Sequence, residues 1–111
     1  MVELEQLGAE VLELPADAAD ERAMAEVLRR ASERFGQVHG VFHSALHLED
    51  RLLATKSPEQ ATRVLRPKID GTLALDRLLD GMPLDFLALF SSLAAFDPAP
   101  GQFDYAAASA F

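Results

Sequence analysis

The sequence predicts an α/β fold in which helices connect the strands of a parallel sheet. Three observations support this prediction: short apolar runs alternate with longer segments of helical periodicity, glycine or proline marks most boundaries, and the last apolar run ends in two serines. Alternating strands and helices are typical of a parallel sheet with crossover helices. With 111 residues, half of them hydrophobic and a quarter charged, the chain suits at most one globular domain.

Periodicity and helix-breaking residues define the expected elements. In chain order these are a helix end at 2–8, a strand at 9–14, a helix at 21–35, a strand at 38–43, a loop at 46–54, a helix at 58–65 with its continuation at 69–79, a strand at 84–90 and a helix that opens near Tyr105. We expect Pro67 to kink or restart the helix in which it lies, because proline lacks a backbone N–H.

The two long helices carry the clearest end signals. Asp20 is the expected N-cap of the first, and Gly36 is expected to end it. Its apolar residues recur at helical spacing: Ala23, Met24, Val27, Leu28, Ala31 and Phe35. The second helix opens on Ser57-Pro58-Glu59-Gln60, which is a serine cap, a first-turn proline and a glutamine three residues after the cap.

Composition argues against several functional classes. No apolar run reaches the roughly 18 residues that a membrane span needs, and no signal segment opens the chain. Without cysteine there is no disulfide framework and no thiolate metal site. A net charge of −8 is unsuited to binding phosphates. We therefore expect a cytoplasmic protein that binds neither membranes nor nucleic acid.

The segment from the last strand to the C-terminal helix is the best candidate for chemistry. The strand ends at Ser91 and Ser92, a loop with Pro98, Pro100 and Gly101 follows, and then comes the helix near Tyr105. Ligands of open α/β sheets bind outside the carboxyl ends of the strands. We therefore expect Ser92 at a ligand site, with Tyr105 brought back beside it.

Five ordered motifs cover most of the chain from residue 40 onward. They are Val41-Phe42-His43-Ser44-Ala45, Leu65-Arg66-Pro67-Lys68-Ile69-Asp70-Gly71, Leu89-Phe90-Ser91-Ser92, Pro100-Gly101-Gln102 and Tyr105-Ala106-Ala107-Ala108-Ser109-Ala110-Phe111. As a set they resemble the ketoreductase domains of modular polyketide synthases, a branch of the short-chain dehydrogenase/reductase superfamily. The resemblance implies a Rossmann-like fold that uses NADPH to reduce a β-ketoacyl thioester carried by an acyl carrier protein.

The resemblance also implies the catalytic residues. Tyr105 matches the proton donor, Ser92 the serine that hydrogen-bonds the substrate oxygen, and Lys68 the lysine near the tyrosine and the nicotinamide ribose. An ammonium beside a tyrosine favours its ionised form and so helps the hydroxyl to release a proton. Ser109 stands four residues after Tyr105, where the family normally has asparagine. Serine can also donate and accept a hydrogen bond, but it is shorter.

Other matched positions imply cofactor contacts and stereocontrol. His43, Ser44 and Ala45 match the turn that runs along the cofactor, which usually ends in glycine where this chain has Leu46. Asp17 matches the position that usually contacts the adenine ring; a plain turn aspartate is the alternative.

Leu48-Glu49-Asp50 resembles the Leu-Asp-Asp motif of ketoreductases that give a D-configured (B-type) hydroxyl, with Asp50 at the diagnostic position. Pro100 fits the same class. We expect Glu49 itself to be a solvated acid.

Three histidines at four-residue spacing, His39, His43 and His47, suggest a metal site only if they lie on one helix. Residues 38–43 are expected to form a strand, on which four residues span about 13 Å. That separation is too long for shared ligation, so we expect no metal site.

The six glycines are scattered, and no G-x-G-x-x-G turn for a cofactor pyrophosphate occurs. We therefore expect residues 1–111 to be the central portion of a ketoreductase domain, without its glycine-rich turn and its C-terminal portion, and inactive alone. The rest of that domain and the neighbouring synthase domains would be its partners. Two alternatives stay open: a catalytically silent, structural ketoreductase-like subdomain, and a free-standing short-chain dehydrogenase.

Overall fold

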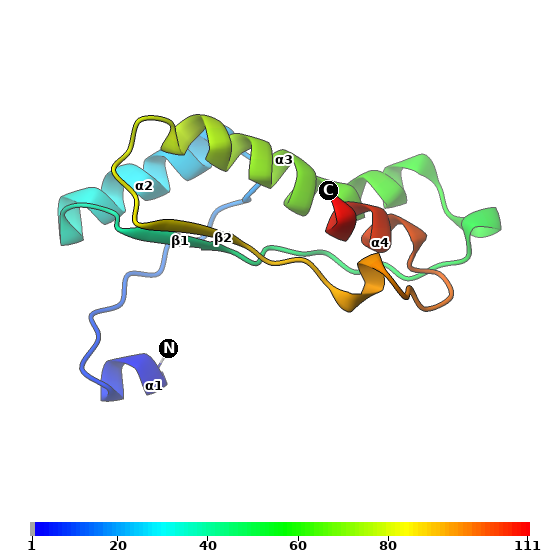
Figure 1. The fold of residues 1–111 in the computed structure, drawn as a ribbon, viewed down its shortest axis with the longest axis horizontal. Coiled ribbons are helices and arrows are strands. Elements are labelled where there is room, and N and C mark those ends of the chain that lie inside the picture. Colours follow the sequence, from blue (N-terminus) through cyan, green and yellow to red (C-terminus); the bar gives the residue numbers. More distant parts are fainter. Residues whose placement is uncertain (1) are drawn as a thin grey trace.

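The alternation of helices and strands predicted from the sequence is present in the structure, a computed structural model that describes residues 2–111 (Figure 1). In chain order the elements are α1 (Val2–Gln6), α2 (Glu21–Phe35), β1 (Gly40–His43), the 3-10 turn η1 (Leu53–Thr55), α3 (Pro58–Leu79), β2 (Phe86–Leu89), the 3-10 turn η2 (Leu93–Ala95) and α4 (Phe103–Ala110).

The two strands pair in parallel, as predicted, and α3 is the crossover helix between them. The register sets Gly40 opposite Phe86 and His43 opposite Leu89. Both long helices, α2 and α3, lie side by side on one face of this sheet, and α4 packs against α3 (Figure 1). The buried apolar residues are mostly on α3: Val64, Ala74, Leu75 and Leu79, with Ala94 and Ala108.

Aromatic side chains near the strands are exposed in the described part of the chain. Phe42 and Phe86 contact each other with ring centroids 4.9 Å apart, and Phe90 lies 6.2 Å from Phe42. All three are about half exposed or more. Within residues 2–111, the helices therefore leave part of the apolar surface of this two-stranded sheet uncovered.

The prediction of a strand at 9–14 is wrong. These residues form an irregular segment that leads from α1 to α2 (Figure 1). A strand needs a neighbour for its N–H and C=O groups, and in residues 2–111 the only paired strands are β1 and β2. An ion pair between Arg34 and Glu10 links this segment to α2.

The predicted helix ends are confirmed. The Asp20 carboxylate accepts hydrogen bonds from the N–H groups of Arg22 and Ala23, at 2.9 and 3.1 Å. Gly36 closes α2 with a φ of 82°. At the start of α3, Ser57 and Gln60 each accept a hydrogen bond from the other's backbone N–H. These bonds satisfy N–H groups that have no partner within the helix.

A restart of the helix at Pro67 is not observed, because α3 is one helix from Pro58 to Leu79. Buried residues lie on both sides of the proline, with Val64 before it and Lys68 and Gly71 after it. Packing on both sides holds the helix in place although proline removes one of its hydrogen bonds.

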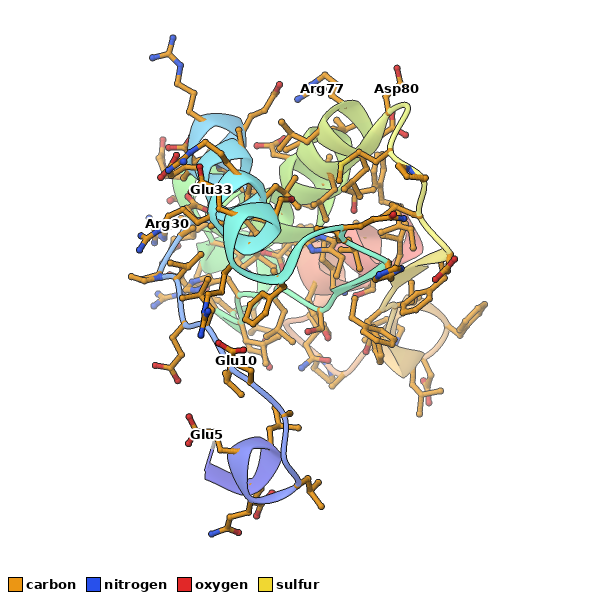
Figure 2. All side chains as sticks on the ribbon, turned by 90° about the vertical axis from the view of Figure 1, so that its left-hand side faces the viewer. Glu5, Glu10, Arg30, Glu33, Arg77 and Asp80 are labelled. Carbon is orange, nitrogen blue, oxygen red and sulfur yellow. The ribbon has the colours of Figure 1, made fainter. Side chains whose placement is uncertain are left out.

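The outer faces of α2 and α3 are charged (Figure 2). Arg77 of α3 forms an ion pair with Glu21 of α2 at 2.8 Å. In residues 2–111, no helix combines the length and the apolar character needed to cross a bilayer.

Candidate active site

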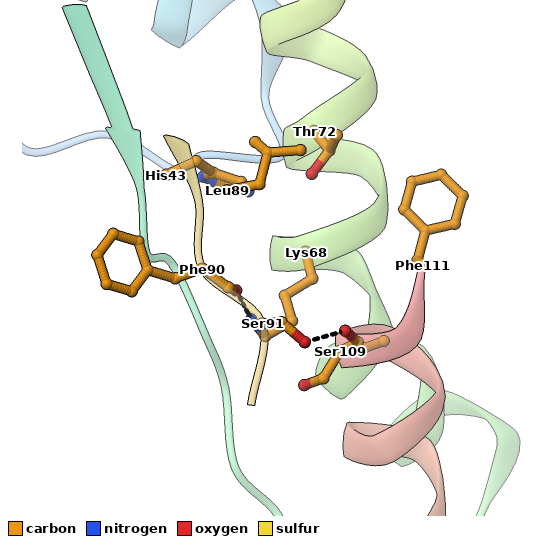
Figure 3. A pocket seen from close by; sticks show the side chains of 9 residues that line it. His43, Lys68, Thr72, Leu89, Phe90, Ser91, Ser109 and Phe111 are labelled. Atoms are coloured by element: carbon orange, nitrogen blue, oxygen red, sulfur yellow. Dashed lines mark hydrogen bonds between the residues drawn. The ribbon is translucent and has the colours of Figure 1, made fainter. Parts of the chain in front are cut away.

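Lys68 is a buried cation at the carboxyl end of the sheet. It lies on α3, and only 7% of the residue is exposed. Its Nζ donates a hydrogen bond of 2.5 Å to the carbonyl of Phe90, the residue that follows β2 (Figure 3). This bond fixes the ammonium where the strand ends, which is where ligands of open α/β sheets bind.

Tyr105 lies beside this cation. The Lys68 Nζ is 5.9 Å from the centroid of the Tyr105 ring, within the range in which an ammonium and an aromatic ring attract each other. The two residues come from α3 and α4, which pack together. The structure therefore brings together the lysine and the tyrosine that the resemblance singled out.

The two serines after β2 have different partners. Ser91 donates a 2.6 Å hydrogen bond to the main-chain carbonyl of Ser109, near the end of α4 (Figure 3). Carbonyls in the last turn of a helix lack a partner within the helix, so Ser91 satisfies this one and ties α4 to the strand end. Ser92 caps η2 by accepting a hydrogen bond from the N–H of Ala94 at 3.2 Å.

A cavity of about 120 Å³ lies between β2, α3 and α4. Its lining residues include His43, Lys68 and Ser109 (Figure 3). His43 Nε2 and Ser109 Oγ are buried, and neither atom has a hydrogen-bond partner within residues 2–111. The cavity thus has two unpaired polar atoms and one cation in its walls.

Burial lowers the pKa of His43, and the nearby positive charge of Lys68 lowers it further. The backbone carbonyls of Pro67 and Lys68 favour the protonated ring and offset part of this shift in pKa. The imidazole therefore prefers to be neutral, and its Nε2 can donate or accept depending on the tautomer.

Asp17 is not among the residues that line this cavity, and it lies in an exposed turn. Its carboxylate accepts a 2.9 Å hydrogen bond from the N–H of Ala19 and lies 3.6 Å from Arg66. Together with Leu46 it lines an open depression of about 250 Å³. Asp17 therefore lies beside the segment that follows β1, where Ser44 is exposed and Ala45 is half-buried.

Asp50 is joined to the loop that precedes α4. Its carboxylate accepts a 2.7 Å hydrogen bond from the side chain of Gln102. The next residue, Arg51, donates its N–H to the carbonyl of Gly101 at 3.1 Å. Pro100 is the exposed neighbour of Gly101, so both residues proposed for stereocontrol belong to one pair of contacting segments.

Glu49 stays at the surface but is partly covered, with 24% of its side chain exposed, and it is paired. It accepts hydrogen bonds from Gln60 at 2.7 Å and from Arg63 at 3.0 Å. Burial alone would raise the pKa of Glu49, but the hydrogen bonds and the charge of Arg63 lower it overall. These bonds link the loop to the first turns of α3.

The three histidines are in different surroundings. His39 is paired with Asp85 at 3.6 Å, and His47 lies 3.7 Å from Glu49. His43 is buried against α3. Among residues 2–111, no three or more His, Asp or Glu side chains form a group that could hold a metal ion.

Sequence reasoning missed two contacts in this region. One is the hydrogen bond from Ser91 to the carbonyl of Ser109, because the sequence pointed to Ser92 and not to Ser91 as a site residue. The other is an ion pair between Lys56 and Asp104, whose side chains are 1% and 2% exposed. A signal for the second was present: an aspartate stands directly before the candidate tyrosine, in the first turn of the helix.

Two parallel strands joined by one helical crossover, with a lysine beside a tyrosine at their carboxyl end, match the Rossmann-like fold expected of the short-chain dehydrogenase/reductase superfamily. The family model described as "KR domain" matches residues 1–111. The chain therefore belongs to the ketoreductase domains of polyketide synthases.

Individual proteins agree with this assignment. Polyketide synthase ThaG of Burkholderia thailandensis is 46% identical over 107 residues, which is 96% of this chain and 2% of that protein. A solved N-terminal ketoreductase from the macrolactin assembly line is 40% identical, with a TM-score of 0.92 over 97% of this chain and 22% of its own. A ketoreductase domain from the bacillaene assembly line is 38% identical, with a TM-score of 0.90 over 97% of this chain and 26% of its own.

Proposed function

We propose that this chain contributes the catalytic residues for NADPH-dependent reduction of a β-ketoacyl thioester to the β-hydroxy product, on an acyl carrier protein within a polyketide synthase. The observation that carries the proposal is the contact between Lys68 and Tyr105, whose ammonium and ring lie 5.9 Å apart at the strand end. Ketone reduction needs a proton donor, and a positive charge beside a tyrosine helps its hydroxyl to release the proton.

The chemistry divides between the cofactor and the protein. NADPH, when bound, supplies the hydride that the carbonyl carbon accepts. The Tyr105 hydroxyl gives its proton to the carbonyl oxygen, so that the ketone becomes an alcohol. Ser92 uses its oxygen to accept from Ala94, which leaves its hydroxyl hydrogen free to donate to the same substrate oxygen.

Lys68 has one bond to the Phe90 carbonyl and can donate two more. Its charge favours release of the tyrosine proton. We propose that the proton is then restored through a water held by Ser109, whose buried Oγ has no partner within residues 2–111.

The cavity residues fit a nicotinamide cofactor in chemical type. Lys68 is a donor, and His43 and Ser109 each have a buried polar atom without a partner in the described residues. At about 120 Å³ the cavity is smaller than the roughly 300 Å³ at which ligand pockets begin. We propose that Lys68, Tyr105, His43, Ser44, Ala45 and Asp17 hold one side of NADPH, and that the remainder of the domain holds the other.

We propose a D-configured product. Support comes from the hydrogen bond between Asp50 and Gln102, which joins the acidic segment to the loop that carries Pro100. The second of these segments leads into α4 and Tyr105, so the two together can limit the direction from which the substrate enters.

The chain spans 22% and 26% of the two solved ketoreductases, so activity is a proposal about the complete domain. Its other partners would be the acyl carrier protein and the neighbouring synthase domains. A cytoplasmic location stays a prediction.

The test uses the complete ketoreductase domain that carries residues 1–111, with NADPH and a diketide thioester. We expect turnover in the wild type, and we expect Tyr105→Phe to lower kcat by at least about 10²-fold, the low end of a general acid–base contribution. NADPH affinity should hardly change, because the hydroxyl acts in the transition state. Glu33→Gln, at a side chain of α2 that is 63% exposed, is the control.

Chiral chromatography of the product tests the stereochemical proposal in the same experiment. An L-configured alcohol would refute it. A complete domain that binds NADPH but does not reduce the thioester would favour the structural subdomain, and full activity of Tyr105→Phe would remove the tyrosine from the mechanism.

A further inference from the structure

Lys56 and Asp104 form a buried ion pair outside the cavity. Lys56 follows η1, and Asp104 lies in the first turn of α4, directly before Tyr105. The two side chains are 1% and 2% exposed. The Lys56 ammonium lies against Oδ2 of Asp104, and within residues 2–111 that oxygen accepts no hydrogen bond from another group.

Each member of the pair also holds a second group. The Lys56 Nζ donates to the main-chain carbonyl of Glu49 at 2.7 Å, and it lies 5.5 Å from the Phe103 ring centroid. Oδ1 of Asp104 accepts the N–H of Tyr105 at 3.0 Å. One lysine thus connects the residue before Asp50 with the residue before Tyr105.

Two more bonds join the same segments. Arg51 donates its N–H to the carbonyl of Gly101, and Gln102 donates to the carboxylate of Asp50. The approach is close: a Cβ on Gly101 would stand 3.1 Å from the backbone nitrogen of Arg51. Among the contacts that join these two segments, the one made by Lys56 is charged and buried. The hydrogen bond between Asp50 and Gln102 is exposed.

A buried ion pair is weak evidence for stability, because removing two charges from water offsets most of their attraction. The ion pair matters instead for geometry. A buried charge that loses its partner is strongly unfavourable, so the residue after η1 and the first turn of α4 must keep their relative position. The geometry points to Lys56 as a positioning residue that fixes the start of α4, and with it Tyr105, against the segment that carries Asp50. This inference rests on the proposed reduction by Tyr105.

The test compares Lys56 variants in the complete domain, with kcat, KM and the ratio of product stereoisomers as readouts. Lys56→Met leaves the Asp104 carboxylate buried without a cation, so α4 should shift at its first turn. A misplacement of about 1 Å can cost roughly 10²-fold in rate. We expect a loss of that size in kcat, a smaller change in KM, and an eroded stereoisomer ratio.

The double variant Lys56→Met/Asp104→Asn is the rescue. It removes both charges, and the asparagine Oδ1 can still accept the N–H of Tyr105. We expect it to recover most of the lost kcat, while Asp104→Asn alone should be impaired because it leaves Lys56 unpaired. A fall in melting temperature with unchanged kcat and unchanged stereoisomer ratio would show that the pair is only structural and would overturn the inference.

A readout without activity separates this inference from the proposed function. Amide hydrogen exchange at Arg51 and Tyr105 should speed up in Lys56→Met even if no substrate is reduced, and unchanged protection at both amides would overturn the inference. If Lys56→Met does not fold, Lys56→Arg keeps the charge but places the donors differently. It should show the same faster exchange and altered stereoisomer ratio, and wild-type values for both would count against the role of Lys56.

Discussion

The imidazole of His43 lies directly against the backbone of Gly71. A Cβ at Gly71 would stand 3.0 Å from Cε1 and 3.2 Å from Nε2 of this ring, and 3.3 Å from the carbonyl oxygen of Ala18. A side chain at position 71 of α3 would therefore press on the end of β1 and on the turn before α2. Close packing of a helix on a strand end explains the glycine here without any need for an unusual backbone angle.

Gly71→Ala should destabilise the complete domain. Alanine gains about 1 kcal/mol of helix propensity over glycine, but forcing a methyl group into a packed site typically costs about 1–3 kcal/mol. We expect a net loss because the contact with Ala18 is to a backbone oxygen, which no side-chain rotation can relieve. Denaturant unfolding measures the free energy, and the loss should shrink in a His43→Ala background. Equal losses in both backgrounds would mean that the contact with His43 is unimportant.

Stability should fall as the pH drops through the range in which histidine titrates. The pKa of His43 is lowered in the fold, first by burial, from an ordinary value of 6.5. Below about pH 6.5 the unfolded chain then binds more protons than the folded one, so the free energy of unfolding decreases as the pH falls. The contribution is fully present above pH 6.5 and is lost toward the lowered pKa. Urea unfolding at about pH 5 and pH 7 measures how much the free energy of unfolding changes between the two pH values. This change should be smaller for His43→Gln than for the wild type, and equal changes would contradict the prediction.

Lys68→Met should weaken both NADPH binding and turnover. The ammonium is expected to contact the cofactor ribose and to act beside Tyr105, so the loss in kcat/KM should be at least about 10²-fold. Arg77→Met removes an exposed cation from the same helix and is the control. Lys68→Met also leaves the Phe90 carbonyl without its donor, which costs about 1–3 kcal/mol. Folding of this variant is therefore checked by thermal unfolding. Full activity in Lys68→Met would end the assignment of this lysine.

Ser109 should tune the rate without controlling cofactor binding. Ser109→Ala removes the buried hydroxyl and should lower kcat by up to about 10²-fold, whereas Ser109→Asn should keep or raise it. Both variants retain the main-chain carbonyl that Ser91 holds, so the end of α4 should stay in place. Steady-state turnover across pH 6 to 9 is the measurement. An unaltered rate in Ser109→Ala over that range would leave only a packing role.

The helices could be predicted because their signals are local. Asp20 and the pair Ser57 and Gln60 bond to N–H groups within three residues of themselves, so the bonds are implicit in the sequence. A strand depends on a neighbour elsewhere in the chain or outside it. Residues 9–14 therefore form none in this structure, although their sequence suits one.

The site was predictable to a smaller extent. The proximity of Lys68 and Tyr105 was implied by family resemblance, and the structure agrees with it. The ion pair of Lys56 and Asp104 depends on the path of two loops, which periodicity does not describe. Local sequence reasoning did not identify the partners of Glu49 for the same reason: they lie on α3, beyond the loop.

The crossover unit of β1, α3 and β2 has a consequence for the order in which the site is made. The hydrogen bond that holds the Lys68 ammonium at the strand end joins two residues of one uninterrupted stretch, from Gly40 to Phe90. A ribosome releases this stretch before it releases Tyr105, at about 5–20 residues per second. Both partners of the Lys68 hydrogen bond are therefore synthesised before Tyr105, so the position of the cation depends on residues that precede the tyrosine in the chain.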